Sequence, residues 1–295
     1  MVLKLAKIWF SRLAQARRIT SIIVVAWATG AAFAQPLTGP RLEVATQRYW
    51  RPDQVIYVND HLKCLMGLYE SKGDWSRIVS DISLRAGEKE TPLLAWCSPA
   101  MQSVGETAQL PRAEGKAGGF VITLAPIPSA KSDLPAVWKT KGAMLFDSNA
   151  ADFGVREEIA VTQACTDEVS CLRLATHPAA PVTDIRVFNG EVTRPELPEK
   201  ETLNEPGTAL ALIGPQGITV VSLDRQATSP ELLVEPPRII VRPANGQRSC
   251  FWTFHVTTQG KQAFHAEWRV RLLPADTPEE ELGRILSPQN GGERK

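Results

Sequence analysis

Short apolar runs, separated by proline, glycine, asparagine and aspartate, recur along most of this chain. Typical runs lie at 93–96, 120–124, 218–221 and 238–241, and several are rich in β-branched residues. Runs of about four to eight such residues between turn residues are typical of antiparallel sandwiches and barrels, whereas βαβ units alternate strands with helices. We therefore predict a mainly β protein with an antiparallel, sandwich-like fold and few short helices.

The clearest alternation lies between Cys250 and Leu272. Even-numbered positions are apolar on both halves of this segment, and odd-numbered positions are mostly polar. Residues opposite each other in a hairpin must share a face, so a hairpin here needs a loop with an odd number of residues. This predicts a loop at 258–260, with Trp252 and Trp268 pointing into the core.

The same register predicts a polar outer face. It makes His255 and His265 diagonal neighbours, and Glu267 and Arg269 continue their row. Imidazoles near a carboxylate can bind a ligand, hold a metal or exchange protons, but the outer face of an antiparallel sheet is often only solvated. We take these four residues as candidate binding residues, and we assign no catalytic residue and no metal ligand.

Helical spacing appears in two places. Apolar residues at 75, 78, 79 and 82 make 74–84 a candidate helix, and 60–70 is a second candidate. Near the C-terminus, Thr277 is a candidate N-cap, followed by Pro278 at the first helical position and Glu280 three residues after the cap. We expect 275–295 to form a short helix and a flexible tail.

Two proline-rich polar stretches, 126–136 and 194–207, are typical of linkers. They predict an N-terminal β-containing domain at 41–128 and a larger C-terminal β domain at 138–274, which the second stretch can divide. The sequence Val-Glu-Pro-Pro-Arg-Ile-Ile-Val-Arg-Pro at 234–243 resembles the rhythm of immunoglobulin-like domains in bacterial envelope proteins. This resemblance implies an immunoglobulin-like sandwich for that region.

The first 34 residues have the three parts of a secretory signal peptide. Five basic and no acidic residues precede or flank an apolar stretch of about 16 residues, and Ala32-Phe33-Ala34 offers a cleavage site. This stretch is shorter than the roughly 20 residues that span a bilayer. We expect cleavage and a periplasmic or secreted protein without a stable membrane span, with a retained anchor as the alternative.

Charge argues against nucleic acid as a partner. The whole chain has 33 Lys and Arg against 32 Asp and Glu, a formal net charge of +1. Loss of the signal peptide would leave 28 basic and 32 acidic residues, a net charge near −4. Nucleic-acid binding relies on clustered basic residues, so an envelope protein or peptide is the partner that we expect.

All five cysteines lie after the signal peptide, where an oxidising compartment favours disulfides. Residues 155–161 and 171–174 alternate like two strands of a hairpin with a polar loop at 166–170, which predicts a Cys165–Cys171 disulfide. Cys64 and Cys97 form the second predicted pair. Cys250 is left over.

No motif for catalysis or cofactor binding accompanies this fold. The sequence has no GxSxG, HExxH, GxxxxGK[ST] or GxGxxG pattern, and we expect no cofactor. The leading hypothesis is an exported, non-catalytic envelope protein that acts by binding or scaffolding. Because catalytic groups can assemble in space rather than in sequence, the alternative is a secreted or periplasmic hydrolase using His255 or His265.

Overall fold

The computed structural model describes residues 41–45, 54–71, 74–98, 106–108, 112–116, 119–124, 126–128, 138–244 and 246–287. Contacts between Cα atoms divide the chain into two units, 1–38 and 39–295, and every described residue belongs to the second. The predicted signal peptide at 1–34 lies outside the described residues.

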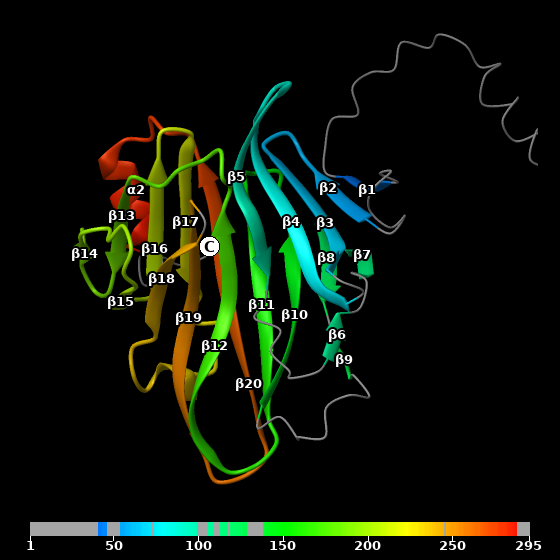
Figure 1. Ribbon diagram of the computed structural model, residues 1–295, viewed down its shortest axis with the longest axis vertical. Coiled ribbons are helices and arrows are strands. Elements are labelled where there is room, and N and C mark those ends of the chain that lie inside the picture. The colour runs from blue at the N-terminus through cyan, green and yellow to red at the C-terminus, as the bar shows by residue number, and fades with distance from the viewer. Residues whose placement is uncertain are drawn as a thin grey trace, which may run out of the picture. The chain divides into compact units, whose positions relative to one another are not determined.

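Two large antiparallel sheets build the second unit, and we call the first sheet I (Figure 1). It combines strands from the beginning, middle and end of the unit. Its nine strands lie in the order β1 (Arg41–Ala45), β2 (Gln54–Val58), β3 (Leu62–Ser71), β4 (Asp74–Ala86), β5 (Lys89–Ser98), β12 (Cys165–Thr176), β19 (Gln247–Thr258), β18 (Arg238–Ala244) and β15 (Leu203–Pro206).

Sheet II also has nine strands, and its central pair is β20 and β11. The strand order is β14 (Val192–Thr193), β13 (Asp184–Phe188), β16 (Ala209–Gly214), β17 (Gly217–Leu223), β20 (Gln262–Leu273), β11 (Asp152–Val161), β10 (Trp138–Phe146), β8 (Gly119–Leu124) and β7 (Arg112–Lys116). The remaining elements are a small β6 (Glu106–Ala108) and β9 (Pro126–Pro128) sheet, the 3₁₀ helix η1 (Pro230–Leu233) and the helix α2 (Glu279–Leu286).

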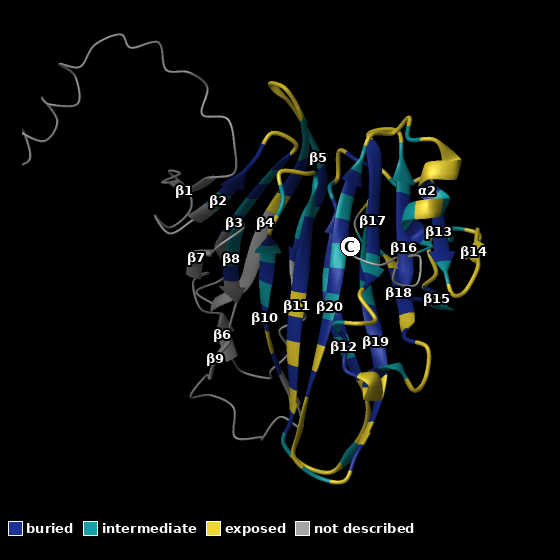
Figure 2. Ribbon diagram, turned by 180° about the vertical axis from the view of Figure 1, so that it is seen from behind, coloured by how far each residue is buried: buried dark blue, intermediate teal, exposed yellow. Residues whose placement is uncertain are grey.

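The apolar core lies between the inner faces of the two sheets (Figure 2). Trp252 of sheet I and Trp268 of sheet II are both 0 % exposed, and their ring centroids are 6.5 Å apart in an edge-to-face arrangement. Phe254 also contacts Trp268, with the ring centroids 6.1 Å apart. The prediction of a mainly β, antiparallel, sandwich-like fold is confirmed, and so is the inward orientation of both tryptophans.

Two pairs of consecutive long strands, β11–β12 and β19–β20, are joined by arches that cross the core and not by hairpins. β11 ends at Val161 in sheet II and β12 begins at Cys165 in sheet I; likewise β19 ends at Thr258 in sheet I and β20 begins at Gln262 in sheet II. Because β11 pairs with β20 and β12 with β19, the two arches stack at one end of the sandwich, at the bottom of Figure 1. The Thr258 hydroxyl donates to the Gln163 carbonyl, 3.4 Å away, and so joins the two arches.

Both predicted hairpins, at 155–174 and at 250–272, are therefore wrong in their pairing. The physical reason is that alternation specifies which side chains face the core, and an arch and a hairpin bury the same side chains. Sequence alternation alone does not distinguish strands that are neighbours in one sheet from strands that face each other across two.

The helices predicted at 60–70 and 74–84 are also wrong. These residues form β3 and β4, an antiparallel pair in which Cys64 lies opposite Ile82. Gly87, with a φ of 63°, then begins the tight turn from β4 into β5, a conformation that glycine adopts without strain. The spacing of apolar residues over one short window does not distinguish a helix from a half-buried strand.

The C-terminal helix is confirmed, with one correction to its start. Pro278, not Thr277, is the N-cap, and no side chain caps the helix; the Thr277 hydroxyl instead donates to the Pro274 carbonyl at 2.8 Å. Leu282 and Leu286 pack on the outer face of β16 and β17, in a second apolar cluster. No helix in the described ranges is long and apolar enough to cross a membrane.

Strands from the two segments predicted as domains share both sheets. β5 pairs with β12 in sheet I, and β8 pairs with β10 in sheet II. Residues 129–137, between the two segments, lie outside the described residues. The domain boundary stays a prediction, which a chain truncated to residues 138–287 would test.

Candidate functional site

The outer face of sheet II carries a network of charged side chains on three neighbouring strands, β10, β11 and β20. On β11, Glu158 lies opposite His265 of β20, and Arg156 lies opposite Glu267. Their neighbours in sequence point inward, because these strands alternate between buried and exposed residues. On the far side of β11, Lys141 of β10 forms an ion pair with Glu158, with 2.7 Å between Nζ and Oε2.

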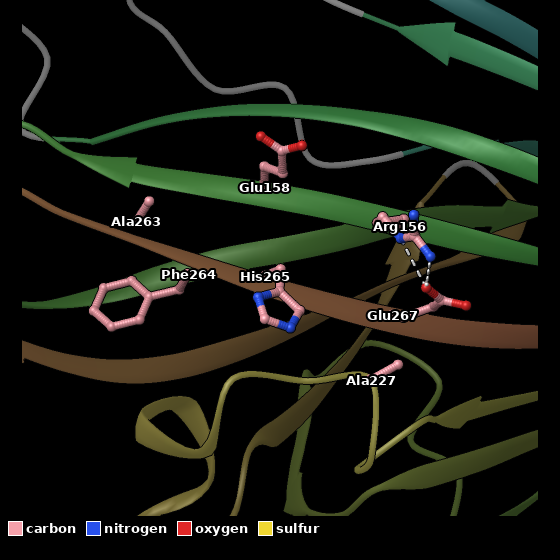
Figure 3. Close-up of a pocket in the computed structure, with 7 residues that line it drawn as sticks. All are labelled: Arg156, Glu158, Ala227, Ala263, Phe264, His265 and Glu267. Atoms are coloured by element: carbon pink, nitrogen blue, oxygen red, sulfur yellow. Dashed lines mark hydrogen bonds and ion pairs between the residues drawn. The ribbon is translucent and has the colours of Figure 1, made fainter.

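These side chains line an open depression of about 420 Å³. Figure 3 shows the Arg156–Glu267 pair and the His265 ring along this face, with Ala227 on the neighbouring loop. The lining residues are Arg156, Glu158, Ala227, Ala263, Phe264, His265 and Glu267. Most of them lie on paired strands, so the backbone ladder fixes their spacing.

Ala227, which lines the depression, belongs to the segment 224–233, which we call the strap. After β17 ends at Leu223, the strap continues beside β20: the Asp224 amide donates to the Glu267 carbonyl at 2.7 Å, and the Ser229 amide donates to the His265 carbonyl at 2.8 Å. The side-chain hydroxyls of the strap accept hydrogen bonds from the β20 amides that face the strap. Thr228 Oγ1 lies 3.3 Å from the Glu267 nitrogen.

His265 and Ser229 place an imidazole and a hydroxyl side by side next to the depression. Nδ1 of His265 lies 2.9 Å from Ser229 Oγ, and the same oxygen accepts a hydrogen bond from the His265 backbone amide, also at 2.9 Å. Ser229 is only 5 % exposed. The geometry therefore holds the strap against β20, and it also places a hydroxyl beside a potential base.

Each carboxylate of the depression contacts a cation. Nε and Nη2 of Arg156 both lie 2.8 Å from Oε2 of Glu267. Glu158 is held in the same way by Lys141. Alternating, neutralised charges on a rigid face suit the binding of polar or charged groups of a partner better than the binding of a polyanion.

Arg269, also predicted for this face, serves a different part of the sheet. Its guanidinium pairs with Asp147 and Asp152 at 2.8 Å each, and so anchors the loop between β10 and β11. Burial alone would lower the pKa of Arg269, but the hydrogen bonds and charges of Asp152 and Asp147 raise it above its ordinary value. Arg269 is outside the lining of the depression.

His255 is not part of this site. It lies on the outer face of sheet I, opposite Glu168 of β12, whereas His265 lies on the outer face of sheet II. The prediction that the two histidines are neighbours is wrong, because β19 and β20 belong to different sheets. Of the four predicted binding residues, the structure brings His265 and Glu267 together in the depression.

The cysteines do not form the predicted disulfides. Cys165 and Cys171 lie six residues apart on one strand, β12, which places them roughly 20 Å apart along the strand. Cys64 and Cys97 are both buried on strands of sheet I and are not bonded to each other. Burial raises the pKa of four thiols, those of Cys64, Cys97, Cys171 and Cys250.

Glu157 is a residue that the sequence reasoning missed. It is 0 % exposed and occupies an inward position of β11, beside Gly142 of β10, which has no side chain, and Ala266 of β20, which has only a methyl group. Its Oε2 accepts a hydrogen bond from the Leu172 amide at 2.9 Å. Leu172 has a φ of 32° and marks a bulge in β12, so the carboxylate connects the two sheets at an irregular point.

Comparisons with known proteins assign this chain to no family. No protein-family model and no curated protein sequence matches this chain. Among solved structures, the chain is similar to the α-galactosidase from Lactobacillus brevis, with 8 % sequence identity and a TM-score of 0.43. The match covers 75 % of this chain and 39 % of the α-galactosidase chain. The GH36 α-galactosidase AgaB from Geobacillus stearothermophilus shares 9 % sequence identity at a TM-score of 0.45. That match covers 79 % of this chain and 41 % of the AgaB chain.

A heparinase III, the BT4657 gene product, is similar at 10 % identity and a TM-score of 0.40, over 83 % of this chain and 38 % of its own. The chain thus spans about two fifths of the length of these structures. Among the described residues, no three His, Cys, Asp or Glu side chains are grouped closely enough to hold a metal ion.

Proposed function

We propose that this protein is an exported, non-catalytic protein of the cell envelope that binds or scaffolds an envelope protein or peptide. The observation that carries the proposal is the depression on sheet II, where Arg156, Glu158, His265 and Glu267 project from paired strands. The pattern of the first 34 residues supports export, to the periplasm or the medium.

The charges of this depression favour a partner that presents both signs. Arg156 and Glu267 pair with each other, so a bound peptide can exchange that contact for contacts of its own with each group. Exposed ion pairs contribute only about 0–1 kcal/mol each, so breaking this one for a partner costs little. A polypeptide segment with neighbouring acidic and basic side chains matches the arrangement.

Affinity isolation from an envelope extract of the native host identifies the partner, and two double variants locate its site. Arg156→Ala with Glu267→Ala is expected to weaken capture at least tenfold. The matched control, Glu168→Ala with His255→Ala, removes a carboxylate and an imidazole from the outer face of sheet I and should bind like the wild type. Equal losses in both variants would contradict the assignment of this site.

A hydrolase is the second candidate function, favoured by the 2.9 Å contact between Ser229 Oγ and His265 Nδ1. Such a pair could activate the hydroxyl as a nucleophile. A screen against ester, peptide and glycan substrates tests this candidate. Turnover that Ser229→Ala and His265→Gln both abolish, in variants that unfold at the wild-type midpoint, would replace the binding proposal.

A further inference from the structure

Two arginines and a phenylalanine gather on the outer face of sheet I, on the opposite side of the sandwich from the depression. Arg173 of β12 lies directly opposite Phe251 of β19, and Arg242 lies on β18, the next strand. The flanking residues on each strand, among them Leu174, Trp252 and Val241, are buried, so these three side chains share the outer face.

The guanidinium of Arg242 stacks over the aromatic ring. Its Cζ atom lies 4.8 Å from the centroid of Phe251, within the range of a cation–π contact. A guanidinium stacked in this way keeps its N–H groups at the edge of the plane, where they can donate to an acceptor that approaches from solvent. Arg242 is itself exposed.

Neither guanidinium has a carboxylate within 4.0 Å in the part of the chain that the structure describes. Arg156, Arg186 and Arg269 do have such partners. Burial lowers the pKa of Arg173; the buried charge of Glu157 opposes this, and Arg242 lowers it further. Arg173 and Arg242 lie on the two strands that flank β19, one on each side of Phe251.

We propose that Arg173, Phe251 and Arg242 form a binding site for a phosphate group. Two cations that flank one aromatic ring, with no carboxylate within 4.0 Å among the described residues, match a group that carries close to two negative charges, whereas a single carboxylate would neutralise only one. Both arginine forks can donate pairs of hydrogen bonds to phosphate oxygens. The ring of Phe251 offers an apolar surface to whatever carries the phosphate.

The test is calorimetric titration of the purified protein at constant ionic strength with inorganic phosphate, phenyl phosphate and acetate. Arg242→Gln and Arg173→Lys are each expected to raise the Kd for phosphate at least tenfold. The matched control is Arg238→Gln, an exposed arginine on the same strand and face that is bonded to Asn204. Its Kd should stay within twofold of the wild-type value.

The two phosphate probes separate the sources of the ligand. Tighter binding of phenyl phosphate than of inorganic phosphate, lost in Phe251→Leu, points to a phosphate ester; equal binding points to free phosphate, and either result supports the site. No saturable binding, acetate binding as tight as phosphate, or an equal loss in Arg238→Gln would overturn the proposal. Arg156→Ala should leave these titrations unchanged, so this site and the depression on sheet II can fail independently.

Discussion

Truncating Glu157 to alanine removes the acceptor that holds the bulge of β12. In the folded protein, the Leu172 amide donates to the Glu157 carboxylate across the core, 2.9 Å away. Alanine would leave that amide buried between two sheets without its acceptor. The perturbation therefore acts on the contact between the sheets and not on the surface.

The expected size of the effect combines three contributions. A hydrogen bond to a charged acceptor contributes about 1.5–3 kcal/mol, and an unsatisfied buried amide costs about 1–3 kcal/mol. The removed side-chain atoms leave a cavity, while loss of a buried charge offsets part of the sum because its desolvation is relieved. We expect Glu157→Ala to lower the free energy of unfolding by about 3–5 kcal/mol.

A milder variant separates the acceptor from the charge. Glu157→Gln keeps a side-chain oxygen that can accept from Leu172, and we expect a loss of about 1–2 kcal/mol, the difference between a charged and a neutral acceptor. The control is Glu158→Gln on the outer face, where only the exposed pair with Lys141 is lost, for less than about 1 kcal/mol.

Urea unfolding followed by tryptophan fluorescence measures these differences, because Trp252 and Trp268 are both in the core. Hydrogen exchange of the Leu172 amide gives an independent readout: protection should fall in Glu157→Ala and persist in Glu157→Gln. Full stability of Glu157→Ala, or unchanged protection of Leu172, would refute the role assigned to this carboxylate.

Three further predictions test the core, the pairing and the thiols. Trp268→Ala should lower the free energy of unfolding by about 3–5 kcal/mol, and His255→Ala by less than about 0.5 kcal/mol, in the same urea assay; equal effects would contradict their placement. Cysteines introduced by Glu158→Cys and His265→Cys should form a disulfide on mild oxidation, seen as a linked peptide by mass spectrometry, because these positions are cross-strand partners; a hairpin between β19 and β20 would prevent it. Native alkylation should label Cys165 before the four buried cysteines, and a peptide map showing a native disulfide would contradict this. Because burial raises the folded-state pKa of those four thiols, their contribution to stability is complete below the pKa of an unfolded thiol, about 8.5, and is lost as the pH rises above it.

Side-chain burial was largely predictable from the sequence, and strand pairing was not. The alternation between Cys250 and Leu272 correctly predicts that Trp252, Trp268 and their even-numbered neighbours face the core. It predicts nothing about which strand lies beside β20, because β11 is about a hundred residues away in sequence. The simplest assumption is that strands consecutive in the sequence pair with each other, and this assumption fails for β11 and β12 and for β19 and β20.

The candidate site shows the same division. His265 and Glu267 could be placed on an outer face from their position in β20, and the structure confirms that placement. Arg156 and Glu158 come from β11 and Ser229 from the strap, so they reach His265 only through pairings with high sequence separation. A single sequence contains no local signal for contacts of this kind.

Two local irregularities in the sequence do carry information about the structure. Glu157 is a charged residue in the inward phase of β11, between Val155 and Ile159, which are both buried. On β12 the buried positions change phase, from Val169 and Cys171 to Leu172 and Leu174, as a bulge requires. The two irregularities meet in the core, where the charge of one strand satisfies the amide that the bulge of the other leaves without a ladder partner. In this protein the carboxylate and the bulge stabilise each other, because the amide of Leu172 and the side chain of Glu157 are buried and each provides a hydrogen-bond partner for the other.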